Sequence, residues 1–219
     1  MKAMILAAGR GERMRPLTDQ TPKPLLQIGA HCLIEHHILR LHKAGYHDIV
    51  INTAWLGEQI RSLLGNGDRY GVSIQYSDEG DTALETGGGI YKALPLLGKS
   101  YFLVVNGDIW CDHSLAAPEI RPDILAHLVL VDNPTHNLAG DFSLIGGLVC
   151  NRPKTLTFSG IGWYHPDLFA HCRAGKFPLA PILRNAIDRQ QVSGEHYQGH
   201  WSDIGTPKRL EALQVTLDG

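Results

Sequence analysis

The chain has 219 residues, of which 43% are hydrophobic, so it can form one sizeable core and we expect a single domain over 1–219. Its formal net charge is -2, which argues against nucleic acid or an anionic membrane as a partner. No apolar run is long enough to span a bilayer. The four cysteines are widely spaced and form no C-x-x-C pair, which indicates reduced thiols and a cytoplasmic protein.

The first expected element is a short buried strand over 2–6, which runs directly into a loop rich in glycine and cations. Gly9 and Gly11 allow the backbone to curl close to an anion, so that its amides face phosphate oxygens. The cations beside them, which suit phosphate, are Arg10, Arg13, Arg15 and Lys23. A solvated turn is the simpler interpretation of this segment alone, since the Walker and G-x-G-x-x-G patterns are both absent.

Strand-like and helix-like segments then alternate, which predicts a sheet covered by helices. The expected strands are 48–52, 72–76, 101–105, 126–131, 142–144 and 156–163. The expected helices are 33–44, 56–64, 90–97, 166–174, 179–188 and 208–217, with Pro207 in the first turn of the last and Thr206 as its cap. The fold class is therefore α/β, a Rossmann-like three-layer sandwich with a mixed, mainly parallel sheet.

Two aspartates are candidate ligands for Mg²⁺. Asp108 belongs to N-G-D, which follows the buried strand 101–105, and ligands collect at the carboxyl ends of strands in open α/β sheets. A carboxylate there suits Mg²⁺, which takes few protein oxygens besides phosphate and water. Asp203 lies in W-S-D-I-G-T-P. Taken alone, the first motif favours a turn and the second a helix start.

A third motif, L-E-T-G-G-G-I at 84–90, opens a helix, where exposed amides and missing side chains permit close approach by a nucleotide. A flexible glycine turn is about as good an interpretation of this segment alone. The twelve histidines form no H-E-x-x-H or cysteine-paired set, so we do not expect them to bind a metal.

Together, A-A-G-R-G-E-R-M-R-P-L-T, T-P-K-P-L, N-G-D and W-S-D-I-G-T resemble the signature of the sugar-phosphate nucleotidyltransferases. The resemblance covers nearly the whole chain and implies the nucleotide-diphospho-sugar transferase type of fold. It implies a nucleotide-binding part over about 1–110 and a sugar-binding part over about 111–205. It also implies an enzyme that uses Mg²⁺ and transfers a nucleotidyl group to a sugar 1-phosphate. The expected substrates are UTP and N-acetylmuramic acid 1-phosphate, in cell-wall sugar recycling.

The resemblance also assigns residues. It implies catalytic roles for Arg15, Lys23 and Asp108, and a metal site at Asp108 and Asp203. The sugar phosphate is expected at Asn106, Gly140, Asp141, Ser159 and Gly160. Glu85 replaces the first glycine of the related L-G-T-[AG]-G, and Gly80 stands where many relatives have glutamine. The expected nucleotide-binding residues are Leu6, Ala7, Ala8, Gly9, Arg10, Gly11, Glu12, Arg13, Gly80, Glu85, Thr86 and Gly88.

Other interpretations stay open. Mannose or glucose 1-phosphate are alternative acceptors, and so is phosphocholine, for which Trp163, Tyr164 and Trp201 are candidate cage residues. A non-catalytic nucleotide-sugar sensor belongs to a different class, but a sensor has no need for the full set of cations and carboxylates. Arg152 and Lys154 are the candidate cations for an acidic acceptor. We expect a monomer or a small homo-oligomer.

Overall fold

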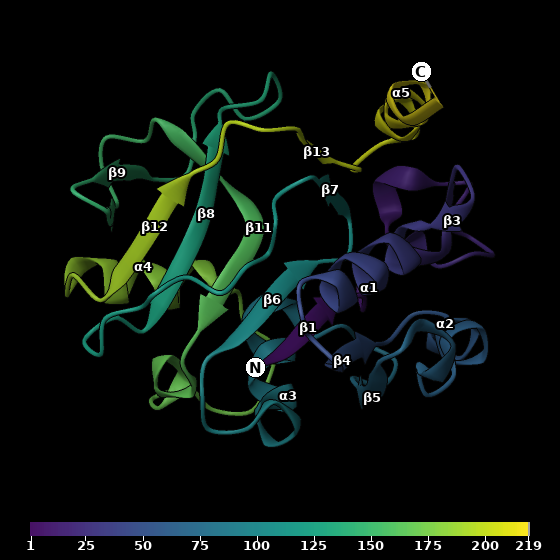
Figure 1. Cartoon of the computed structure of the whole chain (residues 1–219), viewed down its shortest axis with the longest axis horizontal. Helices are drawn as coiled ribbons and strands as arrows, with labels where there is room; N and C mark the ends of the chain where they lie inside the picture. Colours follow the sequence, from purple (N-terminus) through teal and green to yellow (C-terminus); the bar gives the residue numbers. More distant parts are fainter. Residues whose placement is uncertain (219) are drawn as a thin grey trace.

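The centre of the protein is a nine-stranded sheet in the order β5-β4-β1-β6-β11-β8-β12-β10-β9 (Figure 1). The computed structural model describes the backbone of residues 1–218 and the side chains of residues 1–216. β5, β4, β1 and β6 pair in parallel, as do β8 and β12, whereas β11 and β10 run against their neighbours. The strands are β1 (Lys2–Leu6), β4 (Asp48–Thr53), β5 (Ser73–Asp78), β6 (Phe102–Asn106), β8 (Ala126–Asp132), β9 (Ser143–Ile145), β10 (Leu148–Cys150), β11 (Leu156–Tyr164) and β12 (Val192–His196).

Helices cover both faces of this sheet, which confirms the predicted three-layer α/β class. Neighbouring side chains of a strand point to opposite faces. Ile5 of β1 accordingly shares one buried cluster with Ile38 and Ile60, whereas Met4 shares another with Ile90. The helices are α1 (Leu33–Lys43) and α2 (Gly57–Leu64) on the first face, α3 (Glu85–Leu97) and α4 (Ala180–Asp188) on the second, and α5 (Pro207–Asp218). Within the described residues, no helix combines the length and apolar character needed to cross a membrane.

Helix α3 begins at Glu85, five residues before its expected start, and so includes three buried glycines. Glycine weakens a helix interior, which is why the sequence places the helix later. The packing explains the difference. A Cβ on Gly87 would lie 2.6 Å from the ring of Phe177, and one on Gly88 would lie 2.3 Å from the carbonyl oxygen of Gly175. These glycines therefore allow the segment 175–177 to lie directly on the helix.

The helix expected over 166–174 is wrong, because only a short 3₁₀ turn forms there, η4 (Pro166–Phe169). The chain then turns towards the glycines of α3 instead of continuing as a helix. The sequence also gave no sign of β10 and β12, nor of two small two-stranded sheets. These are β2 (Gln27–Ile28) with β3 (His31–Cys32), and β7 (Ile109–Cys111) with β13 (Trp201–Asp203). Elements of two or three residues carry no readable hydrophobic period, and the five residues of β12, V-S-G-E-H, include only one apolar side chain.

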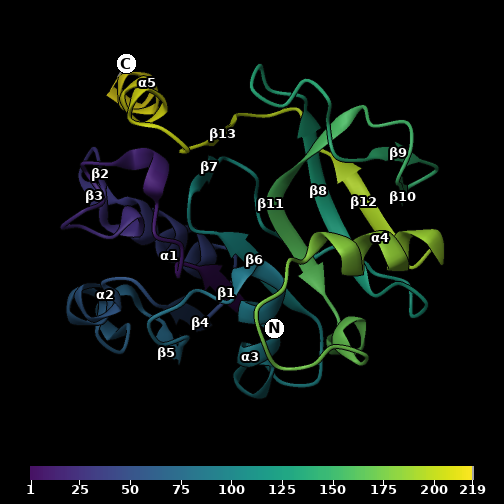
Figure 2. The same ribbon diagram turned by 180° about the vertical axis from the view of Figure 1, so that it is seen from behind.

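The C-terminal segment returns to the N-terminal half of the protein. β13 pairs with β7 so that Asp203 lies opposite Ile109, the neighbour of Asp108. Helix α5 then places Leu210 and Leu213 in one buried cluster with Met14 of the glycine-rich loop. Figure 2 shows α5 near β2 and β3, away from the large sheet. The two motifs expected to share a metal are thus joined by backbone pairing.

All four cysteines are free, as expected for reduced thiols. Burial raises the pKa of Cys32 to about 12 and that of Cys111 to about 11. Because the thiolate is the reactive form, these two thiols stay protonated and inert at neutral pH.

His37 of α1 makes the stability of this core sensitive to acid. Burial, with a smaller contribution from the charge of Arg40, lowers the pKa of His37 from 6.5 to about 3. The unfolded chain takes up a proton below pH 6.5, but the folded protein does not. Stability is therefore complete above pH 6.5 and is lost as the pH falls towards 3, with about 2 kcal/mol lost from this residue at pH 5.

We expect His37→Leu to remove this component, so that its free energy of unfolding depends less steeply on pH between 6.5 and 5 than that of the wild type. Urea unfolding at several pH values measures the slope. The exposed His171 provides the control, and His171→Gln should keep the wild-type slope. Equal slopes for His37→Leu and wild type would contradict the assignment.

Candidate active site

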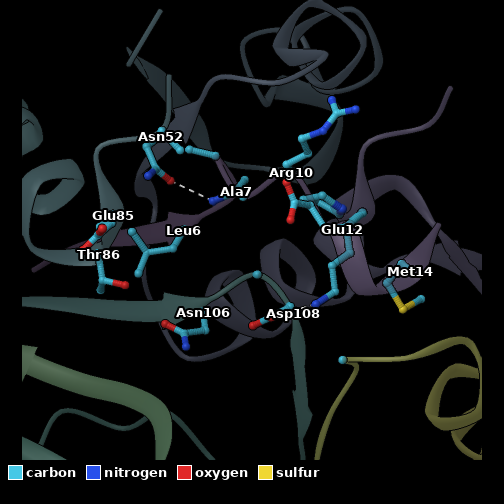
Figure 3. Close-up of a pocket in the computed structure, with 18 of the residues that line it drawn as sticks. Leu6, Ala7, Arg10, Glu12, Met14, Asn52, Glu85, Thr86, Asn106 and Asp108 are labelled. Carbon is cyan, nitrogen blue, oxygen red and sulfur yellow. Dashed lines mark hydrogen bonds and ion pairs between the residues drawn. The ribbon is translucent and has the colours of Figure 1, made fainter. Parts of the chain in front are cut away.

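A cavity of about 510 Å³ lies where the parallel strands β1 and β6 end (Figure 3). Leu6 and Asn106 are the last residues of these strands, and both line it. In Figure 3, Glu85 and Thr86 lie across the cavity from Glu12. Its lining includes most of the expected nucleotide-binding residues, namely Leu6, Ala7, Ala8, Gly9, Arg10, Gly11, Glu12, Arg13, Glu85 and Thr86, together with Lys23, Asn106 and Asp108.

Gly107 explains how N-G-D fits against the end of β1. Its amide donates a hydrogen bond of 2.9 Å to the carbonyl oxygen of Leu6, which continues the pairing of β1 with β6. A Cβ on this residue would lie 2.5 Å from that same oxygen. A residue without a side chain is therefore required, and the close approach brings Asp108 to the edge of the cavity.

Lys23 and Asp108 form the central ion pair of the cavity. The Lys23 Nζ donates to Asp108 Oδ2 at 2.7 Å. The lysine side chain is 9% exposed and the aspartate side chain 41% exposed. Lys23 starts a 3₁₀ turn, η2 (Lys23–Leu25), between Pro22 and Pro24. A buried cation thus holds a carboxylate that still faces the cavity.

Asn52 and Glu79 line the cavity, although neither belongs to a motif that the sequence revealed. Asn52 Oδ1 accepts from the amide of Ala7 at 2.7 Å, and its Nδ2 donates to Glu79 Oε1 at 2.6 Å. Glu79 Oε2 accepts from the amide of Leu84 at 2.6 Å. Both side chains are almost fully buried. The network ties the start of the glycine-rich loop to the segment that precedes α3.

We expect Asn52→Leu to lower the free energy of unfolding by about 2–4 kcal/mol, because it leaves the buried amide of Ala7 and the Glu79 carboxylate without their partner. It should also weaken nucleotide binding, since the loop loses its anchor. Urea unfolding and nucleotide titration measure the two effects. Asn66 is exposed and bonds Asp68, so Asn66→Leu serves as the control, with a loss below about 1 kcal/mol. If the two variants lost equal free energy of unfolding, the hydrogen bonds of Asn52 would not stabilise the fold more than an exposed pair does.

The arginines of the loop lie in three different settings. The Arg10 guanidinium stacks 3.7 Å from the ring centre of Trp55, and in Figure 3 it extends away from Asp108. Arg15 pairs with Asp19 at 2.6 Å and does not line the cavity. Arg13 lines the cavity beside Gly205, where a Cβ would lie 3.4 Å from the Arg13 Nη1. Arg13 is therefore the arginine of this loop that lies beside Gly205 and Asp203.

Asp203 lies beside the same edge of the cavity but has protein partners. His136 Nε2 approaches its Oδ1 at 2.9 Å, and Arg209 donates to its Oδ2. A Cβ on Gly205, which lines the cavity, would lie 2.9 Å from Asp203 Oδ2. The backbone of Ile204 also donates to the carbonyl oxygen of Asp108 at 2.7 Å. The two carboxylates are thus held by neighbouring strands.

The donor set fits a hard divalent cation. Among the described residues, no donor contacts Asp108 Oδ1, whereas Asp203 must exchange Arg209 or His136 for the metal. Within that part of the chain, no three His, Cys, Asp or Glu residues lie together as a complete metal site. The cation would take its remaining oxygens from phosphate and water, which is the usual environment of Mg²⁺.

Several expected residues lie outside the cavity lining. Gly80 occupies a turn at φ +75° and Gly88 packs against Gly175. Asp141 Oδ2 accepts from the amide of Phe158 at 3.0 Å, beside Gly140. Ser159 and Gly160 lie behind Asn106, since a Cβ on Gly160 would meet that side chain at 2.7 Å. The sequence analysis gave no role to seven further lining residues. Met14, Pro24, Gly107 and Gly205 belong to its motifs, whereas Asn52, Glu79 and Ala83 lie outside them.

The chain belongs to the nucleotidyl transferase family, because the sequence model of that family matches residues 2–120. An N-acetylmuramate alpha-1-phosphate uridylyltransferase from Neisseria meningitidis serogroup B is 52% identical over 98% of this chain and 97% of that protein. A protein of the same name from Caulobacter vibrioides is 33% identical over 98% of this chain and 96% of its own length. The predicted family is confirmed.

A solved structure supports the fold independently. It is described as a glucose-1-phosphate thymidylyltransferase from Bacillus anthracis and superposes with a TM-score of 0.84 at 24% identity, over 99% of this chain and 94% of that one. At this identity the likeness concerns the fold alone. It confirms the nucleotide-diphospho-sugar transferase type expected from the sequence.

Proposed function

We propose that this protein transfers UMP from UTP to N-acetylmuramic acid 1-phosphate, giving UDP-N-acetylmuramate and pyrophosphate. The observation that carries the proposal is the Lys23–Asp108 pair at the edge of a cavity formed by a glycine-rich loop. The choice of substrates is supported by the relatives from Neisseria meningitidis and Caulobacter vibrioides, which carry that activity in their names.

The reaction needs alignment and charge neutralisation more than proton transfer. The second pKa of a phosphate monoester is about 6, so the acceptor phosphate is largely doubly ionised at pH 7 and requires no general base. One of its oxygens attacks the α-phosphorus of UTP. The bond from that phosphorus to the bridging β-oxygen breaks, and pyrophosphate leaves with the electron pair.

The residues around the cavity have separate roles in this proposal. The amides of Gly9–Gly11 cradle the triphosphate, Arg13 and Arg15 neutralise its β- and γ-phosphates, and Lys23 bridges donor and acceptor phosphates. Asp108 and Asp203 would hold Mg²⁺, which neutralises phosphate charge when bound. Arg15 would have to leave Asp19 to take part.

The remaining assignments follow the expected division of the single domain into two parts. Leu6, Gly80, Glu85 and Thr86 would bind base and ribose, and the first 110 residues would hold the nucleotide. Gly88 was expected beside them, but it packs against Gly175 and its amide donates to Phe177, so it has no such role in the proposal. The sugar phosphate would lie near Asn106, in the part beyond residue 110, towards Gly140, Asp141, Ser159 and Gly160. We place the enzyme in the cytoplasm, in cell-wall sugar recycling, as a monomer or small homo-oligomer.

Pyrophosphate release tests the proposal. UTP, CTP, GTP and dTTP are each combined with N-acetylmuramic acid, glucose and mannose 1-phosphates and with phosphocholine, in the presence of Mg²⁺. The pair UTP and N-acetylmuramic acid 1-phosphate should have the highest kcat/KM. A different best pair would reassign the substrates, and no release with any pair would favour the sensor.

A further inference from the structure

A second cavity of about 400 Å³ lies beside the first and is lined by residues 131–136, 197–199, 201–203 and Arg209. Trp201 of its lining donates from Nε1 to the carbonyl oxygen of Ser159 at 2.8 Å. Gly160 comes next in the chain and packs against Asn106, which lines the first cavity. Ser159 and Gly160, two of the residues expected to receive the acceptor, therefore lie between Trp201 of the second cavity and Asn106 of the first.

This second cavity already holds a carboxylate, that of Asp203. Arg209 binds its Oδ2, His136 Nε2 lies 2.9 Å from its Oδ1, and the two basic groups are 3.4 Å apart. The Arg209 side chain is 25% exposed, so its guanidinium is partly removed from solvent. The other acidic residue of the lining, Asp132, faces solvent and pairs with His196 at 2.9 Å. The cavity is thus a place where a guanidinium and an imidazole bind a carboxylate.

We propose that Arg209, assisted by His136, binds an acidic substituent of the sugar 1-phosphate acceptor in this second cavity. This inference rests on the proposed function, in which the acceptor carries a carboxylate and Asp203 binds the divalent cation. Arg209 holds Asp203 Oδ2, the oxygen that lies near Gly205 of the first cavity, so a cation bound by that oxygen takes the carboxylate from Arg209. A carboxylate on the acceptor would replace it, through charge-assisted hydrogen bonds that a guanidinium forms well.

The same geometry gives a reason for acceptor selection. A neutral acceptor would leave Arg209 without an anionic partner, and leaving a partly buried charge unpaired costs free energy. The two cations that the sequence analysis suggested for an acidic acceptor do not lie in this cavity. Arg152 and Lys154 are exposed between β10 and β11 and line neither cavity.

Kinetics with two acceptors test the proposal. N-acetylmuramic acid 1-phosphate carries a carboxylate on its lactyl ether, and N-acetylglucosamine 1-phosphate is the same sugar phosphate without that lactyl group. We measure the ratio of kcat/KM for the first acceptor to kcat/KM for the second, in wild type, Arg209→Gln and Arg209→Lys. Any loss that Arg209 causes through Asp203 affects both acceptors and divides out. Arg121 pairs with Asp123 outside both cavities, so Arg121→Gln is the matched control.

We expect Arg209→Gln to lower the ratio by about 10- to 100-fold, mainly through KM, with a smaller fall for Arg209→Lys and none for Arg121→Gln. Calorimetric binding of N-acetylmuramic acid 1-phosphate should weaken in parallel. An unchanged ratio in a folded Arg209→Gln protein overturns the inference and leaves the proposed function intact. A wild type that does not turn over the carboxylate-bearing acceptor overturns both.

Discussion

Asp108→Asn is expected to lower the rate of pyrophosphate release by on the order of 10³-fold while the protein stays folded. The amide has the shape of the carboxylate but lacks its negative charge, so it binds a divalent cation poorly. It also leaves the buried Lys23 ammonium without its ionic partner at 2.7 Å. Both effects disturb the region where the phosphates would meet.

The measurement is kcat at saturating UTP and acceptor over a series of Mg²⁺ concentrations. If the aspartate holds the cation, the variant should need more Mg²⁺ and should still not reach the wild-type rate. Asp123 is an exposed carboxylate paired with Arg121, and Asp123→Asn should behave as the wild type. Full turnover of Asp108→Asn at limiting Mg²⁺ would remove Asp108 from the proposed metal site.

How far the sequence could predict this site depends on the range of each contact. The glycine-rich loop and N-G-D are local, so their positions at the ends of β1 and β6 could be predicted from alternating strands and helices. The meeting of Asp108 with Asp203 depends on the pairing of β7 with β13, strands of three residues each. Only the resemblance to a family revealed it beforehand.

Other features had no readable signal. Asn52 ends a buried run and Glu79 follows a strand, and nothing local shows that they bond each other across 27 positions. The glycines of α3 read as a loop because their packing partners lie near residue 175, far along the chain. Gly205 and Arg209 join the site through the same long-range folding. The sequence thus indicated many of the residues that line the cavity, and the structure added the groups that support and enclose them.

Because the two partners of the Lys23–Asp108 ion pair are buried to different extents, we expect Asp108→Asn and Lys23→Met to differ in stability but not in activity. Removing the aspartate leaves a cation that is 9% exposed, whereas removing the lysine leaves a carboxylate that is 41% exposed. Water solvates the second charge far better than the first. Asp108→Asn should therefore destabilise the fold by about 1–3 kcal/mol, and Lys23→Met by much less.

In activity the two variants should be nearly equal. Lys23→Met is expected to lower kcat by about 10²- to 10³-fold, because the ammonium that we propose to bridge the two phosphates is gone while the apolar stem keeps the packing. A residue that mattered only for folding would lose activity in proportion to stability. Here Lys23→Met, the more stable variant, should be almost as inactive as Asp108→Asn, so the difference in stability has no counterpart in activity. Urea unfolding and kcat, measured on the same preparations, separate the two possibilities.

The double variant Lys23→Met/Asp108→Asn tests whether the two residues act together. If Lys23 and Asp108 act as one unit on the phosphates, the loss in kcat for both changes together should be much smaller than the product of the single losses. The stability lost in Asp108→Asn should return in the double variant, since no buried cation remains to be left unpaired. Lys43 is exposed at the end of α1, so Lys43→Met controls for the loss of a positive charge. The pair at 2.7 Å would have no joint role if the loss in kcat of the double variant equalled the product of the single losses and its stability did not recover.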